Sequence, residues 1–106
     1  MIARFWSAHT TPALVDLYLQ HFEQSVSPQL QKLSGFLGAT VGTRPLPRAI
    51  EILVITYWES FAAIEAFAGA DRESAVVAPE AAALLTEFDK RVRHFEVPFR
   101  QFPPPE

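Results

Sequence analysis

The chain has 106 residues and a mass of 11.9 kDa, which is the size of one domain with a modest core. Nine basic and twelve acidic side chains give a net charge of −3, which leaves no basic footprint for nucleic acid. Cysteine is absent, no apolar run approaches the ~20 residues of a membrane helix, and no signal-peptide pattern opens the chain. We therefore expect a soluble cytoplasmic domain that binds neither nucleic acid nor membrane.

The first third of the chain predicts a strand followed by a helix. Residues 1–9 alternate with a period of two, as a strand does. Thr11 before Pro12 is a favoured helix start, and apolar residues then recur at helical spacing. We expect a helix over residues 12–33 that Ser27-Pro28 ends or kinks.

The middle of the chain predicts a β-hairpin. Residues 36–43 are partly β-branched and favour a short strand. Residues 44–47 contain two prolines and predict the turn. Residues 49–58, AIEILVITYW, carry the strongest strand signal in the chain.

The last part predicts helical segments and a closing strand. Ser60 caps a helix that Gly69 stops, and a short turn follows over residues 72–77. A helical rhythm then runs over residues 79–91, and residues 92–97 alternate again as a strand.

The element order β-α-β-β-α-β predicts a ferredoxin-like α+β fold. In this fold a four-stranded antiparallel sheet carries both helical segments on one face, and the first strand is central. We assign residues 1–98 to this domain and residues 99–106 to a proline-rich tail.

Alternation along the strands assigns side chains to two faces of the sheet. The set that we place under the helices is Ala3, Phe5, Ser7, Ile52, Val54, Thr56, Trp58, Phe95 and Val97. The set on the opposite face is Arg4, Trp6, Glu51, Leu53, Ile55, Tyr57, His94 and Glu96. This second set is too apolar for a solvated face, and such patches mark partner surfaces. We expect a homodimer whose sheets pack face to face, with an ion-pair network of Arg4, Glu51 and Glu96 in the interface.

The tail ends in three consecutive prolines and carries Phe99 and Phe102 just before them. Polyproline II is stiff and loses little entropy on docking, and aromatics near a chain end need a surface to pack on. We expect an extended tail that these two aromatics anchor, either on the helices of its own subunit or on the partner.

The chain resembles a known family along nearly its whole length. Residues 56–97, TYWESFAAIEAFAGADRESAVVAPEAAALLTEFDKRVRHFEV, are similar to the signature stretch of the antibiotic biosynthesis monooxygenase superfamily of dimeric α/β barrels. The segments RFWSAHTTP and HFEQSVSPQLQKLSGFLGA resemble the first strand, first helix and second strand of that group. The resemblance implies a sheet-to-sheet dimer and a small pocket in each subunit between sheet and helices.

The activities of that superfamily are diverse. They include cofactor-free oxidation of phenolic polyketides to quinones, haem degradation, and isomerisation, dehydration or decarboxylation of small molecules. The haem-degrading members use an Asn, a Trp and a His ligand at places where this chain has Ser7, Phe67 and Val77. Val77 cannot ligate iron, and no His lies between Trp58 and His94. We therefore expect no haem degradation by that mechanism.

Two residues on the first helix are candidates for catalysis. His21 follows Tyr18 by one turn, so neutral His21 would take a phenolic proton while Tyr18 orients the substrate. The alternative places both at the edge of the core with their polar tips in water. The candidate pocket-lining residues are Phe5, Ser7, Phe22, Thr56, Trp58, Phe67 and Phe88.

Other candidates have structural interpretations. Trp58 either stacks on an aromatic substrate or plugs the core at a strand end. His94 is expected in a structural hydrogen bond on the dimer face, where the interface residues are Arg4, Trp6, Glu51, Tyr57, His94 and Glu96. The three histidines lack metal-site spacing, so no metal and no cofactor is expected.

Two functions remain open from the sequence. One is a cofactor-independent monooxygenase that acts on a phenolic or other enolisable aromatic. The other is a dimer of the same fold that binds a small hydrophobic ligand without turnover. A pocket with converging polar groups favours the first function, and a pocket filled by its own phenylalanines favours the second.

Overall fold

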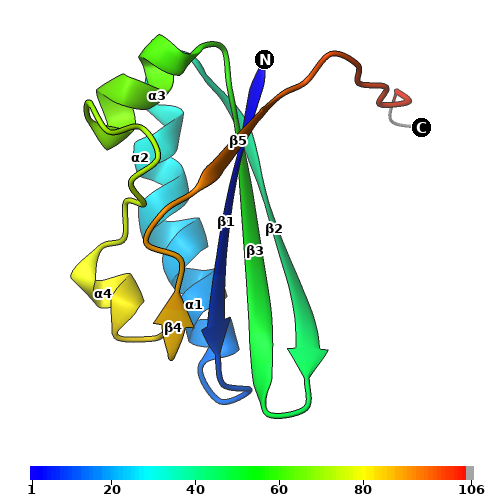
Figure 1. The fold of residues 1–106 in the computed structure, drawn as a ribbon. Helices are drawn as coiled ribbons and strands as arrows, with labels where there is room; N and C mark the ends of the chain where they lie inside the picture. The colour runs from blue at the N-terminus through cyan, green and yellow to red at the C-terminus, as the bar shows by residue number, and fades with distance from the viewer. Residues whose placement is uncertain (105–106) are drawn as a thin grey trace.

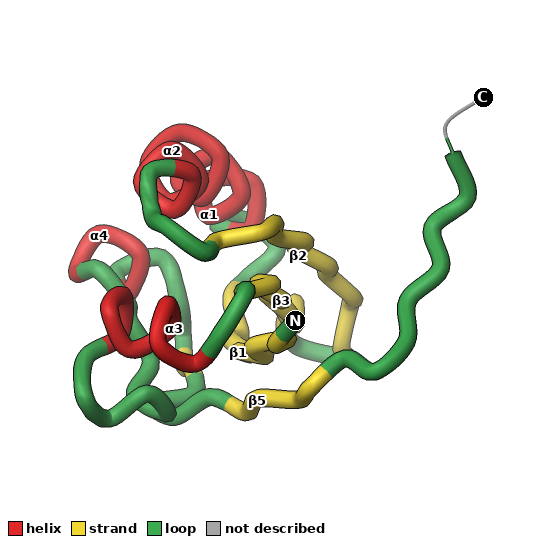
Figure 2. The backbone as a smooth tube through the Cα atoms, turned by 90° about the horizontal axis from the view of Figure 1, so that it is seen from above, coloured by secondary structure: helices red, strands yellow, loops and turns green. Residues whose placement is uncertain are grey.

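A computed structural model describes residues 1–104, in which one antiparallel sheet carries every helix on a single face (Figure 1, Figure 2). The strands are β1 (Ile2–Thr10), β2 (Phe36–Leu46), β3 (Ala49–Trp58), β4 (Glu87–Phe88) and β5 (Arg93–Glu96). The helices are α1 (Val15–His21), a π-helical turn (Phe22–Val26), α2 (Ser27–Gln31), α3 (Phe61–Ala68) and α4 (Pro79–Ala82). Within this part of the chain, no helix has the length and apolar character needed to cross a membrane.

The sheet has the order β2-β3-β1-β4, and β5 also pairs with β1. β4 pairs with the end of β1 at Ala8 and His9, whereas β5 pairs with its beginning, from Ile2 to Phe5. Both short strands therefore occupy the edge of β1 that β3 leaves free. The ferredoxin-like prediction is confirmed, with the last strand divided in two.

The helix expected over residues 79–91 is wrong beyond its first turn. α4 ends at Ala82, and the amides of Thr86 and Asp89 donate to the carbonyls of His9 and Ser7 on β1, at 2.8 and 2.9 Å. The free edge of β1 offers unpaired backbone groups, and pairing them outweighs a local helical rhythm.

The turn expected over residues 44–47 is also wrong. β2 continues through Pro45 to Leu46, and the chain reverses only at Pro47 and Arg48. Proline is compatible with this position because β2 is an edge strand, on which one side of the ladder is empty.

The long helical segment is bent by a π-helical turn rather than ended. Pro28 lies in the first turn of α2 and cannot donate to the carbonyl four residues earlier. The helix widens over the preceding residues, Phe22–Val26, and then continues. α3 has the expected termini: the Ser60 hydroxyl accepts from the Ala63 amide at 3.2 Å, and Gly69 ends the helix with φ of 92°.

The register corrects the assignment of faces. Arg4 pairs with Thr56, Trp6 with Val54, and His94 with Arg4, so these side chains share the helix-covered face. Phe5, Ser7, Phe95 and their neighbours lie on the other, open face. The assignment was right for β3 and wrong for β1 and β5, because alternation fixes the period of each strand but not the register between strands.

Two apolar clusters fill the layer between sheet and helices. One contains the buried residues Ile2, Leu30, Trp58 and Ile64. The other contains Tyr18, Ile52, Val54 and Ala81. Along β1 and β3, the polar pair Arg4 and Thr56 lies between the two clusters.

The tail leaves the domain on the side away from the helices (Figure 2). Phe99 and Phe102 are 76% and 73% exposed, so neither packs on the helices of its own chain. The predicted docking of the tail on the helices of its own subunit is therefore wrong. Docking on a partner stays a prediction, and Pro105 and Glu106 lie outside the described residues.

Candidate functional site

A cavity of about 90 Å³ lies between the sheet and the helices, where the two apolar clusters meet. Its wall is mainly aromatic and aliphatic, with Trp6 from β1, Phe22 from the helical segment and Phe67 from α3. Val76, Val77 and Ala78, from the irregular segment before α4, complete it. Three polar side chains reach this cavity: Arg4, Tyr18 and Thr56.

Among the residues that the structure describes, Arg4 is the only charged one in the cavity wall, and it is 5% exposed. Its guanidinium donates to the carbonyls of Arg72 at 2.5 Å and Ser74 at 2.8 Å. The Phe67 ring centroid lies 5.7 Å from the guanidinium carbon. Burial lowers the pKa of Arg4 to about 10, so the group is still protonated at neutral pH.

The third partner of Arg4 is His94. The Nη1 of Arg4 lies 2.9 Å from the Nε2 of His94. Arginine has only donors, so Nε2 must accept and the proton of a neutral His94 must be on Nδ1. Burial and then the charges of Arg4 and Arg72 lower the pKa of His94, which favours this neutral form.

Tyr18 projects from α1 into the cavity and is 3% exposed. Its ring lies 6.4 Å from that of Trp6, centroid to centroid. Burial raises the pKa of Tyr18 to about 12. The phenol therefore stays protonated and can donate a hydrogen bond to a ligand, but it does not act as a base at neutral pH.

Thr56 is already engaged by the core. Its hydroxyl oxygen accepts from the Trp58 indole at 2.9 Å. Trp58 is 0% exposed and absent from the cavity wall, so its expected role as a pocket residue is wrong and it is a core residue. Its ring stacks on Phe67 at 5.3 Å and meets Phe36 edge-on at 5.4 Å.

The other expected pocket residues divide between the two faces. Phe22, Thr56 and Phe67 line the cavity. Phe5 and Ser7 lie on the open face, because the register of β1 is one residue out of phase with the expectation. Phe88 packs near Trp6 at 6.3 Å without lining the cavity.

The structure separates the two candidate catalytic residues. Tyr18 lines the cavity, whereas His21 does not. His21 lies at the end of α1, and its Nε2 is buried without a hydrogen-bond partner in the described chain. Arg4, which the sequence assigned to the dimer interface, lines the cavity instead. A signal was available: an arginine in mid-strand between apolar residues requires a buried set of acceptors.

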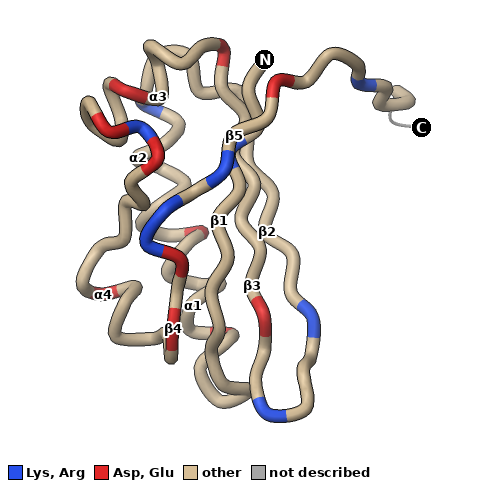
Figure 3. Tube along the Cα trace, in the orientation of Figure 1, with Lys and Arg blue, Asp and Glu red and all other residues tan. Residues whose placement is uncertain are grey.

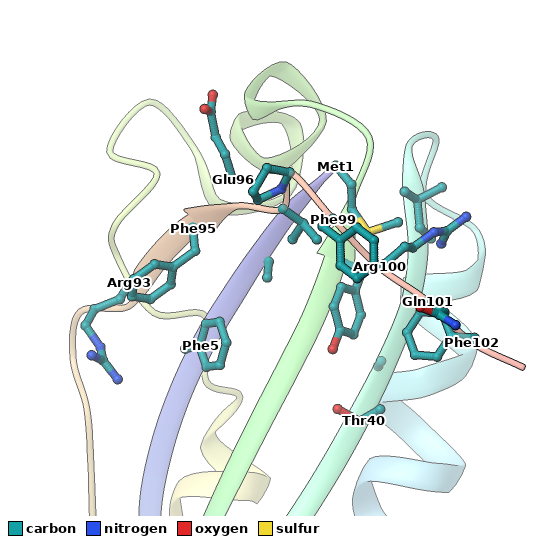
Figure 4. Close-up of a pocket in the computed structure, with 17 residues that line it drawn as sticks. Met1, Phe5, Thr40, Arg93, Phe95, Glu96, Phe99, Arg100, Gln101 and Phe102 are labelled. Carbon is teal, nitrogen blue, oxygen red and sulfur yellow. The ribbon is translucent and has the colours of Figure 1, made fainter.

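A second, larger hollow of about 790 Å³ lies on the open face of the sheet. Phe5 and Phe95 form its floor, with ring centroids 5.3 Å apart, and the tail residues Phe99 and Phe102 form one side (Figure 4). Four of the six exposed large hydrophobic side chains line this groove: Leu37, Phe95, Phe99 and Phe102. The exposed apolar surface of the described chain is therefore concentrated on this face.

Of the residues expected in an interface, Tyr57 and Glu51 lie on the open face, whereas Glu96 pairs with the buried Ile2 and only borders the groove. Tyr57 lines the groove, and Glu51 pairs with Arg44 near the β2–β3 turn. Arg4, Trp6 and His94 lie on the helix-covered face, so the expected ion-pair network around Arg4 is wrong. β2 and β3 carry charge only near their shared turn (Figure 3).

We expect the stability of the protein to fall as the pH drops below 6.5, the ordinary pKa of histidine, partly because of His94. Its pKa is lowered in the folded state, so the unfolded chain binds more protons in this range and acidification favours unfolding. In His94→Gln the amide oxygen accepts from Arg4 without titrating, so the free energy of unfolding should depend less on pH. Urea denaturation across this range measures the difference.

His9→Gln is the matched control for that experiment. His9 lies at the other end of β1, with Nδ1 2.7 Å from Glu87 and far from Arg4 in the sheet register. If His94→Gln leaves the pH profile unchanged, or if His9→Gln flattens it equally, the role assigned to His94 is wrong.

No sequence profile of a known family matches the chain, and no curated protein matches it. Solved structures do. A Bacillus cereus protein assigned to the antibiotic biosynthesis monooxygenases matches with a TM-score of 0.66 and 14% identity, over 99% of this chain and 98% of that one.

Two other solved structures match over nearly their whole length. A monooxygenase from the gene ActVA-Orf6 of Streptomyces coelicolor, in complex with the ligand Nanaomycin D, gives a TM-score of 0.60 and 20% identity, over 98% of this chain and 91% of that one. The haem degrader MhuD from Mycobacterium tuberculosis, with two haems bound in its active site, gives a TM-score of 0.60 and 23% identity, over 96% of this chain and 100% of that one. From β1 to β5, the chain therefore has the ferredoxin-like α+β fold of the antibiotic biosynthesis monooxygenases.

Proposed function

We propose that the protein is a small cofactor-independent monooxygenase that oxidises a phenolic or other enolisable aromatic compound in the cavity between sheet and helices. The observation that carries this proposal is a cavity wall of aromatic and aliphatic side chains that also contains two hydrogen-bond donors, Arg4 and Tyr18. The rings of Trp6, Phe22 and Phe67 suit a flat apolar ligand, and the donors suit its oxygen. The shared fold with a monooxygenase that binds Nanaomycin D supports the same class.

The proposed reaction draws its electrons from the substrate. A phenol and one molecule of O₂ give a quinone and water: one oxygen atom replaces a ring hydrogen as a carbonyl, and the other leaves as water with the two hydrogens lost. Ionisation of the phenol makes the ring electron-rich enough to react with O₂. In this reaction the protein binds, orients and ionises the substrate.

The sequence indicates His21 as the candidate base, and its place in the structure makes that role testable. It lies one turn from Tyr18 on the same helix but outside the cavity wall. His21→Ala tests the assignment. Unchanged turnover in this variant removes His21 from the mechanism.

We further propose that two copies associate through the open face. The groove there concentrates exposed aromatic side chains, and the tail that borders it extends away from its own helices. A symmetric sheet-to-sheet dimer would cover Phe5, Ile55 and Phe95 and give Phe99 and Phe102 a surface to pack on.

A dimer that binds a ligand without turnover is the second candidate. Two observations favour it. None of the described residues in the cavity wall is a base at neutral pH, since Arg4 and Tyr18 are both protonated. The cavity of about 90 Å³ suits one aromatic ring better than a large polycyclic compound.

Oxygen uptake by the purified protein separates these candidates. We expect O₂ consumption with small phenols and hydroquinones, and its loss in Val76→Trp, which places a large ring at the cavity wall. Leu17→Trp is the matched control, because Leu17 is 50% exposed and Val76 53%, but Leu17 does not line the cavity. Ligand binding without O₂ uptake would favour the second candidate.

A further inference from the structure

We infer that Arg4 makes the cavity selective for ligands with an acidic oxygen, which it binds in the ionised form. The ligand class is a single-ring phenol or enol, bound as phenolate or enolate. This inference rests on the proposed role of the cavity as the ligand site, and it assigns substrate ionisation to Arg4 rather than to a protein base.

The charge of Arg4 has no counterion in the described part of the chain. Among residues 1–104, the ion pairs involve His9, Arg44, Arg72 and Arg91, and none involves Arg4. No carboxylate of these residues lines the cavity. A buried cation that is solvated only by neutral acceptors costs free energy, and an anion beside it recovers part of that cost.

The guanidinium of Arg4 has N–H donors that its three hydrogen bonds do not use. Arginine has five N–H donors, and the carbonyls of Arg72 and Ser74 and the Nε2 of His94 take three of them. Two donors are left for a ligand at a group that lines the cavity. The three existing bonds hold the guanidinium in place, so it is preorganised to receive an oxyanion.

The apolar cavity wall strengthens the attraction between Arg4 and a bound anion. The cavity wall is apolar apart from Arg4, Tyr18 and Thr56, so the charge of Arg4 is screened little by water. Tyr18, which also lines the cavity, is protonated and can donate a hydrogen bond to a ligand. On binding, the phenolic proton passes to bulk water and the phenolate oxygen stays beside Arg4.

A purely structural role for Arg4 makes a different prediction. In that case Arg4 only ties the segment containing Arg72 and Ser74 to the sheet, through its two carbonyl contacts. Such a clamp would affect stability, but it would leave the ionisation of a bound ligand unchanged. The pKa of a bound phenol therefore distinguishes the two roles.

The experiment is an absorbance titration of para-nitrophenol, whose ionised form absorbs visible light, with and without excess protein. An adjacent cation lowers an acid's pKa by about one to three units. We expect a decrease of that size for the bound phenol with the unmodified protein and with Arg4→Lys. We expect no decrease with Arg4→Gln, which keeps a donor for the carbonyls but removes the charge. Arg93→Gln, which removes a cation from the open-face groove, should leave the decrease intact.

The neutral analogue para-nitrotoluene separates failure of this inference from failure of the proposed function. If both probes bind, and Val76→Trp blocks both, but the pKa of the phenol is unshifted, the inference about Arg4 is overturned and the ligand site survives. If neither probe binds, both proposals are overturned. Should Arg4→Gln fail to fold, the titration with the unmodified protein and Arg93→Gln still decides, because an unshifted pKa there overturns the inference by itself.

Discussion

Ile55→Glu is expected to prevent the proposed sheet-to-sheet dimer from forming. Ile55 lies in the middle of β3 on the open face, opposite Phe5 and Thr40 on the neighbouring strands. In a sheet-to-sheet dimer its side chain would be buried, so the variant would place an unpaired carboxylate in the interface. Leaving a charge buried without a partner costs about 3–5 kcal/mol. Since each 1.4 kcal/mol is a factor of ten, we expect dimer affinity to fall at least about 100-fold.

Light scattering at micromolar concentration measures this effect. The monomer should keep its fold, because the new carboxylate lies on a face that water reaches. Ala62→Glu adds the same charge at an exposed position of α3 on the helix side, and it should remain dimeric. A monomeric unmodified protein, or a dimeric Ile55→Glu variant, would refute the proposed interface.

Trp58→Ala is expected to remove much of the stability of the fold. Trp58 is 0% exposed, packs on Phe36 and Phe67, and donates its indole N–H to Thr56. Truncation of a buried aromatic side chain to alanine costs about 3–5 kcal/mol, because apolar contacts are lost and a cavity remains. Against a typical stability of about 5–15 kcal/mol, this is a large fraction.

Urea denaturation of the variants measures the loss as a decrease in the midpoint. Trp58→Phe keeps most of the ring contacts and should lose clearly less stability than Trp58→Ala. Phe99→Ala removes an aromatic side chain that is 76% exposed, so the monomer should unfold at nearly the same urea concentration as before. Equal midpoints for Trp58→Ala and Phe99→Ala would show that the core is not organised around Trp58.

The alternation within each strand and the residues that end α3 depend on neighbours in the sequence, so both could be predicted. The run AIEILVITYW gave β3 with its true bounds, and Ser60 and Gly69 gave both ends of α3, because capping and branching act within a few residues. The element order then left one compact topology, which the structure shares with the antibiotic biosynthesis monooxygenases.

What depends on contacts between distant residues was not predicted. The helical spacing of residues 79–91 predicted a helix, but part of this segment pairs its backbone with β1 instead. A local pattern cannot indicate this pairing, because the hydrogen bonds join residues more than seventy positions apart. The same non-local pairing decided the candidate site. The alternation in β1 allowed either Arg4 or Phe5 to face the helices, and a shift of one residue exchanges the two faces. Only the pairing of Arg4 with Thr56 and His94 placed the buried guanidinium in the cavity and left Phe5 on the open face, because the register follows from the packing of the whole sheet.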